Sequence, residues 1–227
     1  MTILVKRWSV SLLVTAIVMV WCTSGFAQKP QGSMLWNFEH VPVGSIPSGW
    51  KIEATGNPHP LATWKVVLDP TAPSGTKVLS LTDVNHHSWS TFNLCWTDKV
   101  SFLNGEISVK LRANSGRIDE GGGIIWRVQD HNNYYVARFN PLENNFRLYY
   151  VKNGIRRQLA SAYVHFPKGQ WITMRIVQDG NRIVCYLNNQ KFLEKEAHVF
   201  NTPGGVGLWT KADAATSFDD FEVRIAQ

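Results

Sequence analysis

Hydrophobic and polar side chains alternate along short stretches in the second half of the chain. In residues 106–112, Ile107, Val109 and Leu111 alternate with polar neighbours, and residues 171–178 repeat this pattern. Side chains along a β-strand point alternately to opposite faces of a sheet, so a period of two is typical of a strand with one buried face. The pattern therefore predicts β-strands over both stretches.

Turn-forming dipeptides separate stretches that are rich in Val, Ile, Tyr, Phe and Trp. These dipeptides are Asn104-Gly105, Asn153-Gly154, Asp179-Gly180 and Asn188-Asn189. The Asp179-Gly180 turn predicts a hairpin between residues 171–178 and 182–187. Further strands are predicted at 78–82, 90–96, 123–129, 134–139, 146–151, 190–194, 205–211 and 219–224, and no helix is predicted. The expected fold class is all-β, a two-sheet antiparallel β-sandwich of the jelly-roll kind.

The start of the chain has the pattern of a secretion signal. Lys6 and Arg7 precede an apolar stretch over residues 8–21, and Gly25-Phe26-Ala27 has the small-x-small form that signal peptidases accept. We expect cleavage after Ala27 and export to the periplasm or the extracellular space.

These limits define the expected organisation: a signal peptide at 1–27, a short N-terminal lead at 28–35 and one jelly-roll domain at 36–227. The apolar stretch is shorter than the ~20 residues that span a bilayer, and no second one follows, so no membrane span is expected. A lipoprotein anchored at Cys22 is the alternative, which the bulky Trp21 before it disfavours.

Composition narrows the class of protein. Charged residues make up 18% of the 227 residues and hydrophobic residues 44%, which excludes a disordered chain or a coiled coil. The net charge is +6, and the loss of Lys6 and Arg7 with the signal peptide reduces it to 6 − 2 = +4. This surplus is too mild to indicate a polyanion, so no nucleic-acid partner is expected.

Two cysteines, Cys95 and Cys185, remain after processing. In an oxidising compartment they form either one disulfide or two buried thiols, and the sequence leaves both open. No CxxC motif or Cys/His cluster indicates zinc.

Three motifs carry a resemblance to a known family. Residues 121–139 combine a Gly-rich turn, an apolar-Arg strand, an Asp/Asn turn and a Tyr-Tyr strand, and residues 205–209 and 218–223 supply closing strands. This arrangement resembles concanavalin A-like, LamG-type jelly rolls, and most of all the bacterial 3-keto-disaccharide hydrolase domain, over residues 36–223. The resemblance implies a secreted, carbohydrate-active protein that is either glycoside hydrolase-like or a noncatalytic carbohydrate-binding LamG-like module.

The carboxylates leave enzymatic activity open. Laminarinase-type enzymes of this fold carry a Glu-x-Asp-x-x-Glu strand, and no such triplet occurs here. Members of the 3-keto-disaccharide hydrolase family, which this sequence resembles, often have a carboxylate on the strand that here reads Tyr-Tyr-Val-Ala-Arg at 134–138. This sequence has no carboxylate there. The remaining acid or base candidates are Glu120, Asp130 and His131, with ordinary turn residues as the alternative interpretation. No catalytic cofactor is expected.

Aromatic and basic residues predict a carbohydrate ligand on the concave sheet, because flat rings stack on pyranose faces and guanidinium groups donate paired hydrogen bonds. The predicted binding residues are Lys110, Arg112, Arg127, Arg138, Arg147, Tyr149, Trp209 and Lys211. A core position for Trp209 and a solvated face for the strand arginines are the alternatives. Residues 86–89 (His-His-Ser-Trp) are interpreted as a loop over this face, with a metal loop as the alternative.

A structural calcium ion is the one ion that the resemblance implies. Related sandwiches often tie the first strand to the last with calcium, and Glu39 here lies near the start while Asp219 and Asp220 lie near the end. With carbonyl oxygens of residues 43–45 they would offer the hard ligands that calcium takes. The alternative is ordinary strand-edge acids. The sequence does not define the oligomeric state.

Overall fold

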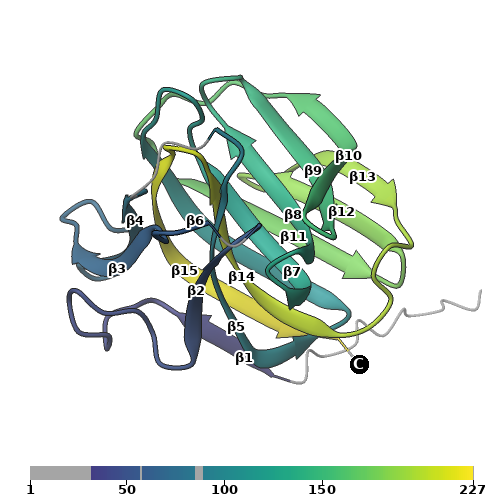
Figure 1. Cartoon of the computed structure of the whole chain (residues 1–227), viewed down its shortest axis with the longest axis horizontal. Coiled ribbons are helices and arrows are strands. Elements are labelled where there is room, and N and C mark those ends of the chain that lie inside the picture. The colour runs from purple at the N-terminus through teal and green to yellow at the C-terminus, as the bar shows by residue number, and fades with distance from the viewer. Residues whose placement is uncertain (1–31, 57, 85–88, 227) are drawn as a thin grey trace, which may run out of the picture.

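The computed structural model describes residues 32–56, 58–84 and 89–226 (Figure 1). In this part of the chain there are fifteen strands and no helix, and hence no helix that would cross a membrane. The strands are β1 (Ser33–Trp36), β2 (Trp50–Ala54), β3 (Thr63–Leu68), β4 (Lys77–Asp83), β5 (Phe92–Phe102), β6 (Gly105–Ser115), β7 (Gly122–Asp130), β8 (Asn133–Asn140), β9 (Asn145–Lys152), β10 (Ile155–Tyr163), β11 (Ile172–Asp179), β12 (Arg182–Leu187), β13 (Gln190–Glu196), β14 (Gly204–Lys211) and β15 (Ala215–Ile225). The expected signal peptide and residues 86–88 of the predicted loop lie outside the described residues.

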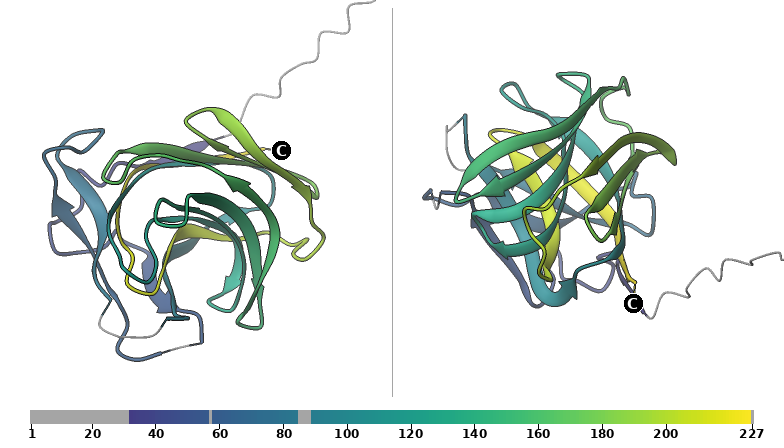
Figure 2. Two further views of the ribbon diagram at one scale, coloured as in Figure 1. Left: turned by 90° about the horizontal axis from the view of Figure 1, so that it is seen from above. Right: turned by 90° about the vertical axis from the view of Figure 1, so that its right-hand side faces the viewer.

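Two antiparallel sheets form a sandwich, and the predicted fold class is confirmed. The eight-stranded sheet has the order β13-β12-β11-β6-β15-β4-β3, with β1 also paired to β15; the seven-stranded sheet has the order β10-β9-β8-β7-β14-β5-β2. Figure 2 shows them as two curved layers, one over the other. The predicted hairpin is confirmed, because Asp179 pairs with Arg182 and the pairing continues to Met174 with Leu187.

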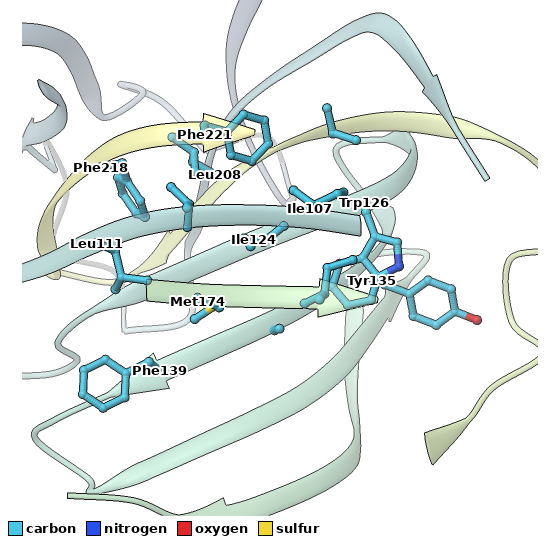
Figure 3. Close-up of a cluster of buried hydrophobic side chains, with 14 of the residues drawn as sticks. Ile107, Leu111, Ile124, Trp126, Tyr135, Phe139, Met174, Leu208, Phe218 and Phe221 are labelled. Atoms are coloured by element: carbon cyan, nitrogen blue, oxygen red, sulfur yellow. The ribbon is translucent and has the colours of Figure 1, made fainter. Parts of the chain in front are cut away.

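Apolar side chains from both sheets fill the space between the layers (Figure 3). Ile107, Val109 and Leu111 are fully buried there, as their alternation predicts. The Trp126 ring stacks on Tyr135 with the centroids 5.6 Å apart, and the buried indole Nε1 donates to Gln178 Oε1 at 2.8 Å. Each such large side chain contributes about 1.5–3 kcal/mol by leaving water, so this layer is the main source of stability.

The strands that the sequence pattern missed lie at the sheet edges. They are β1, β2, β3 and β10, each with a strand on one side only. An edge strand tends to bury less of its surface, and every residue of β10 is exposed or half-buried, so β10 shows little alternation. This weak signal hid β10, the strand that carries Arg156.

The thiols of Cys95 and Cys185 are both unpaired and buried, one on β5 and one on β12. These strands belong to different sheets, and burial raises the pKa of both thiols. Of the two interpretations that the sequence left open, the structure has the buried thiols.

The seven-stranded sheet is strongly curved. Arg156 lies on β10 and Phe92 on β5, which are five strand spacings apart, or about 24 Å along a flat sheet. The guanidinium carbon of Arg156 nevertheless lies 4.9 Å from the Phe92 ring centroid. The sheet therefore curls its two edges toward each other, which makes its outer face concave.

Candidate functional site

The outer face of the seven-stranded sheet, called the concave face below, has an apolar floor. The floor residues are Phe92, Leu94, Trp96, Ile125, Val128, Tyr134, Val136, Tyr149, Val151 and Trp209, all buried. They alternate with residues of the core between the sheets: on β8, Val136 faces outward whereas Ala137 and Phe139 face inward. A sheet face that meets only water is normally polar. A buried apolar floor here indicates a surface shaped for something other than solvent.

Glycines at the start of β7 let neighbouring strands of this sheet approach closely. Gly121 has a φ of 85°, in the left-handed region that favours glycine. A Cβ atom on Gly123 would lie 1.7 Å from the Ala137 carbonyl oxygen of the next strand. Gly123 pairs in register with Trp209 of β14 on one side and with Arg138 of β8 on the other. Because Gly123 has no side chain, none separates the Trp209 ring from the Arg138 side chain at this position.

Arg156 crosses the floor from the edge strand. Its guanidinium carbon lies 4.4 Å from the Tyr149 ring centroid and 5.9 Å from that of Trp209, in addition to the contact with Phe92. Burial lowers the pKa of Arg156. Its buried Nη1 has no hydrogen-bond acceptor in the described part of the chain. The guanidinium is thus held by ring faces alone.

A second cation, Arg138, lies two residues from Val136 on the same face and is 1% exposed. Its Nη1 donates to Asp119 Oδ2 at 3.0 Å, and Lys211 Nζ donates to the same oxygen at 2.9 Å. The Asn140 amide donates to Asp119 Oδ1 at 2.9 Å. Asp119 is therefore a fully engaged carboxylate, while the buried Nε of Arg138 has no acceptor among the described residues.

Glu143 connects two arginines that face each other on neighbouring strands. Arg138 and Arg147 are register partners, an arrangement that repels unless an anion lies between them. Glu143 Oε2 accepts from both, at 2.8 and 3.1 Å, and from the Asn145 amide at 2.8 Å. Burial by itself raises the pKa of Glu143, but the Asn145 hydrogen bond and the two guanidinium charges outweigh it and bring the pKa to about 2. Glu143 is therefore ionised near neutral pH.

The loop after β2 closes the other end of the concave face. Thr55 Oγ1 donates to the His131 carbonyl oxygen at 2.7 Å and lies 2.7 Å from the Tyr134 hydroxyl, which also accepts from Trp209 Nε1 at 3.2 Å. At this end Glu53 Oε2 accepts from Trp96 Nε1 at 2.7 Å, and Glu53 Oε1 lies 4.0 Å from His131 Nδ1. The acid–imidazole pair is half-buried at the rim.

Five of the predicted binding residues share the concave face: Arg138, Arg147, Tyr149, Trp209 and Lys211. Trp209 is fully buried beneath Arg156, so its ring supports the guanidinium instead of meeting a ligand directly. The role of these residues in binding stays a prediction.

Lys110 and Arg112 were expected on this face and lie elsewhere. Both are on β6 of the eight-stranded sheet, where Lys110 pairs with Asp220 at 2.8 Å and Arg112 with Asp69 at 2.5 Å. Alternation predicted correctly that they point away from the core. It does not tell which of the two sheets a strand joins.

Arg127 is a second correction. A bulge in the pairing of β7 with β8 begins after Trp126, and Arg127 has a φ of 46°. The irregular backbone turns its side chain into the protein, where it is 1% exposed and donates to the carbonyl oxygens of Leu103, Gly180 and Phe200 at 2.9, 2.7 and 2.6 Å. Arg127 ties loops together at the end of the sandwich.

The three acid or base candidates do not form one constellation. Glu120 is buried with an ion pair to Lys168 at 2.6 Å, and it points away from Asp119, as expected for neighbours on an extended chain. The nine residues of β7, which span up to about 30 Å, separate it from Asp130. Asp130 accepts from Asn132 N at 2.7 Å, a turn contact. Only His131 lies at the rim of the concave face.

Several residues of the concave face escaped the sequence analysis: Glu53, Asp119, Asn140, Glu143, Asn145 and Arg156. The turn Asn153-Gly154 was recognised, and a hairpin continued past it would have placed Arg156 opposite Val151 on the same face. Asp119 and Glu143 gave no such signal, because they lie on loops, and Glu53 lies on the edge strand β2, which the pattern missed.

The predicted calcium ligands all contact the segment 74–77. Glu39 Oε1 accepts from Lys77 N at 2.7 Å, Asp219 Oδ2 from Ser74 N at 2.9 Å and Asp220 Oδ1 from Ser74 Oγ at 2.7 Å. The two backbone hydrogen bonds from Thr76 and Lys77 lower the pKa of Glu39, whereas burial raises that of Asp219. Among the described residues no group of three or more His, Cys, Asp or Glu side chains is placed to hold a metal ion. Calcium binding stays a prediction.

Comparison with known proteins agrees with this architecture. The sequence profile of the 3-keto-alpha-glucoside-1,2-lyase-like domain matches residues 40–224. Among solved structures, a carbohydrate-binding module from Bacillus subtilis superposes with a TM-score of 0.58 at 17% identity, covering 80% of this chain and 99% of that one.

Two further structures share the fold. The β-glucanase of Bacillus licheniformis has a TM-score of 0.57 at 15% identity, with 86% and 99% of the two chains covered. A galectin-like protein of unknown function from Bacillus subtilis has a TM-score of 0.56 at 13% identity, with 84% and 98% covered. Identities this low establish the fold alone. A comparison with curated sequences gives no match.

Proposed function

The chain belongs to the 3-keto-alpha-glucoside-1,2-lyase-like domain family, and on this premise we propose that it recognises a sugar on the concave face of its seven-stranded sheet. The observation that supports this most is the layer of hydrogen-bond donors over the apolar floor. Arg138, Arg147, Arg156 and Lys211 all project from this one face. Guanidinium forks and ammonium groups donate to the hydroxyl and keto oxygens of a sugar ring.

The family name implies a substrate class. A 1,2-lyase acting on a 3-keto-glucoside removes the C2 proton, which the neighbouring C3 keto group makes acidic; the C1–C2 double bond then forms as the C1–O bond breaks, and the leaving oxygen takes up a proton. Such a step needs a base near C2 and a cation near the keto oxygen. The concave face supplies the cations. We propose a 3-keto-glycoside, or a glycoside related to it, as the ligand of this face.

The carboxylates of the face favour a second candidate, a noncatalytic carbohydrate-binding module. Asp119 accepts from Arg138, Lys211 and Asn140, and Glu143 accepts from two arginines, so both are occupied as structural counterions. His131, 4.0 Å from Glu53 at the rim, is the remaining base candidate on this face. Binding without turnover is the expected result if His131 takes no part.

One experiment separates the candidates: a panel of glycosides and 3-keto-glycosides is tested for binding by calorimetry and for product release by chromatography. Binding is expected to weaken about tenfold in Arg147→Ala, because a hydrogen bond to a charged donor contributes about 1.5 kcal/mol or more. Lys110→Ala on the other sheet is the matched control and should bind as the wild type does. Product release that persists in His131→Gln would exclude that base, and a panel without any binder would refute the proposal.

Export to the periplasm or the extracellular space is part of the proposal. It rests on the charged start, the apolar stretch and the small-x-small site at residues 25–27. Mass analysis of the secreted protein is expected to give a chain that begins at Gln28.

We further propose that calcium stabilises the contact of Glu39, Asp219 and Asp220 with segment 74–77. The convergence of residues from both ends of the chain on one segment supports this. The competing interpretation is that Lys77 and Lys110 already neutralise the site, since their ammonium groups bind Glu39 O at 2.8 Å and Asp220 Oδ2 at 2.8 Å. Added calcium should raise the melting temperature and a chelator should lower it. A melting temperature that changes with neither would exclude a structural calcium ion.

A further inference from the structure

The positive charges of the concave face outnumber its negative charges. Asp119 is shared by Arg138 and Lys211, and Glu143 is shared by Arg138 and Arg147. Two carboxylates thus serve three cations, while the third carboxylate of the face, Glu53, accepts from Trp96 at the rim and pairs with no lysine or arginine of the described residues. Arg156 adds a fourth cation that has no ion pair and no hydrogen bond to any described residue; its contacts are the three aromatic rings.

Two buried donor atoms on this face, Arg156 Nη1 and Arg138 Nε, have no acceptor among the residues that the structure describes. Arg138 is 1% exposed, so water does not replace the missing acceptor freely. A buried donor without a partner costs about 1–3 kcal/mol, and an uncompensated buried charge costs more. Proteins tolerate such a cost where a ligand removes it.

We propose that Arg156 forms a subsite for a carboxylate group, so that the sugar bound on the concave face is an acidic one such as a uronic acid. The inference rests on the proposed sugar-binding function and specifies its ligand class. A planar carboxylate accepts two parallel hydrogen bonds from a guanidinium, which is the geometry that a rigid, ring-supported arginine offers. The rings hold Arg156 in place without using its N–H groups, so the donors stay free for the ligand.

The alternation of β10 provides a matched control. Arg156 pairs in register with Val151 of the concave floor, whereas its neighbour Arg157 pairs with Tyr150, which packs toward the core between the sheets. Arg157 is exposed. The substitutions Arg156→Gln and Arg157→Gln therefore remove the same charge from adjacent positions on opposite faces.

The test uses pairs of methyl glycosides that differ only at C6: methyl glucuronide with methyl glucoside, and methyl galacturonide with methyl galactoside. Calorimetry on the processed full chain is expected to give at least tenfold tighter binding for the acid of one pair. Arg156→Gln should abolish that preference and Arg157→Gln should keep it. The preference should also fall as added salt screens the charges.

The outcomes separate this inference from the function on which it rests. Equal affinity for acid and neutral sugar, or a preference that survives Arg156→Gln in a folded variant, overturns the carboxylate subsite and leaves sugar binding intact. Absence of binding for every member of the panel overturns sugar binding itself. The comparison of acid with neutral sugar on the wild-type chain needs no variant, so it decides even where Arg156→Gln does not fold.

Discussion

The two sheets of the sandwich use strand arginines and lysines in different ways on their outer faces. On the eight-stranded sheet Lys110 pairs with Asp220, Arg112 with Asp69 and Arg175 with Glu106, and the acids Glu106 and Glu194 each pair with two cations. On the concave face of the seven-stranded sheet the cations outnumber the acids. Most of these ion pairs on the first face are at least partly exposed to solvent, whereas on the second face Arg156 contacts aromatic rings and has no ion pair with a described residue.

Curvature causes this difference. The seven-stranded sheet curls until Arg156 of β10 reaches Phe92 and Trp209 on strands from the other half of the sheet. Its concave face excludes water, so the same residue types become buried there. Burial strengthens each electrostatic interaction and raises the cost of each unpaired group.

The largest expected effect distinguishes a buried arginine from an exposed one. Arg138→Met leaves Asp119 and Glu143 with fewer counterions in a buried site and should lower the free energy of unfolding by about 3–5 kcal/mol. Arg175→Met removes a half-exposed pair with Glu106 and the contact with Tyr186, and should cost about 1 kcal/mol. Urea unfolding followed by tryptophan fluorescence measures both. Equal losses would show that the concave face is as solvated as the other.

A smaller effect is expected from the pH dependence of Glu143. Its pKa is lowered in the folded protein to about 2, so its contribution to stability is present above the unfolded pKa of about 4.5 and is lost as the pH falls toward 2. Because the Glu143 side chain is 38% exposed, solvent screening reduces this contribution to about 1–2 kcal/mol. The loss in Glu143→Gln should therefore be present at pH 7 and absent near pH 2.

The control for this prediction lies on the other sheet. Glu194 pairs with Lys191 and Arg182 in an exposed position, and Glu194→Gln should leave the free energy of unfolding almost unchanged at both pH values. A pH-independent loss in Glu143→Gln would show that its contribution is packing and not charge.

The smallest expected effect is on sugar affinity and comes from Tyr149, a residue of the concave face whose substitution removes no charge. Tyr149→Phe removes the hydroxyl that accepts from Arg147 Nη1 at 3.4 Å but keeps the ring that supports Arg156. We expect sugar affinity to change by less than threefold, since that long hydrogen bond is weak. Tyr149→Ala, which removes the ring, should weaken binding further, and calorimetry with the glycoside panel compares the two. Equal sugar affinities of the Tyr149→Phe and Tyr149→Ala variants would argue against a supporting role of the ring.

Much of the fold followed from the order of residues alone. The alternation at Ile107, Val109 and Leu111 and the turn at Asp179-Gly180 are local signals, and each strand and hairpin predicted from them is present. The missed strands β1, β2, β3 and β10 are edge strands; β1 and β10 bury no residue fully, whereas β3 alternates over only six residues, with Trp64 and Val66 buried. Local patterns thus predict central strands better than edges.

The site was less accessible from the sequence. Arg138, Tyr149, Trp209 and Lys211 were expected on one face and lie there, but Lys110 and Arg112 obey the same alternation on the other sheet. The prediction that Arg127 lies on this face is wrong for a different reason, because a bulge after Trp126 turns its side chain inward. Asp119 and Glu143 reach the site from loops, where no period applies.

The sequence by itself determined that the chain forms a two-sheet β-sandwich, since side-chain periodicity and turn chemistry act over a few neighbouring residues. It also determined which side chains of β6 and β11 face the core, because their alternation is regular. Only the tertiary structure decided which cations meet, because strand order and sheet curvature depend on contacts between residues far apart in the chain. Arg156 shows this most clearly: β10 is at the edge of its sheet, and only the curl of the whole sheet places its guanidinium over Trp209.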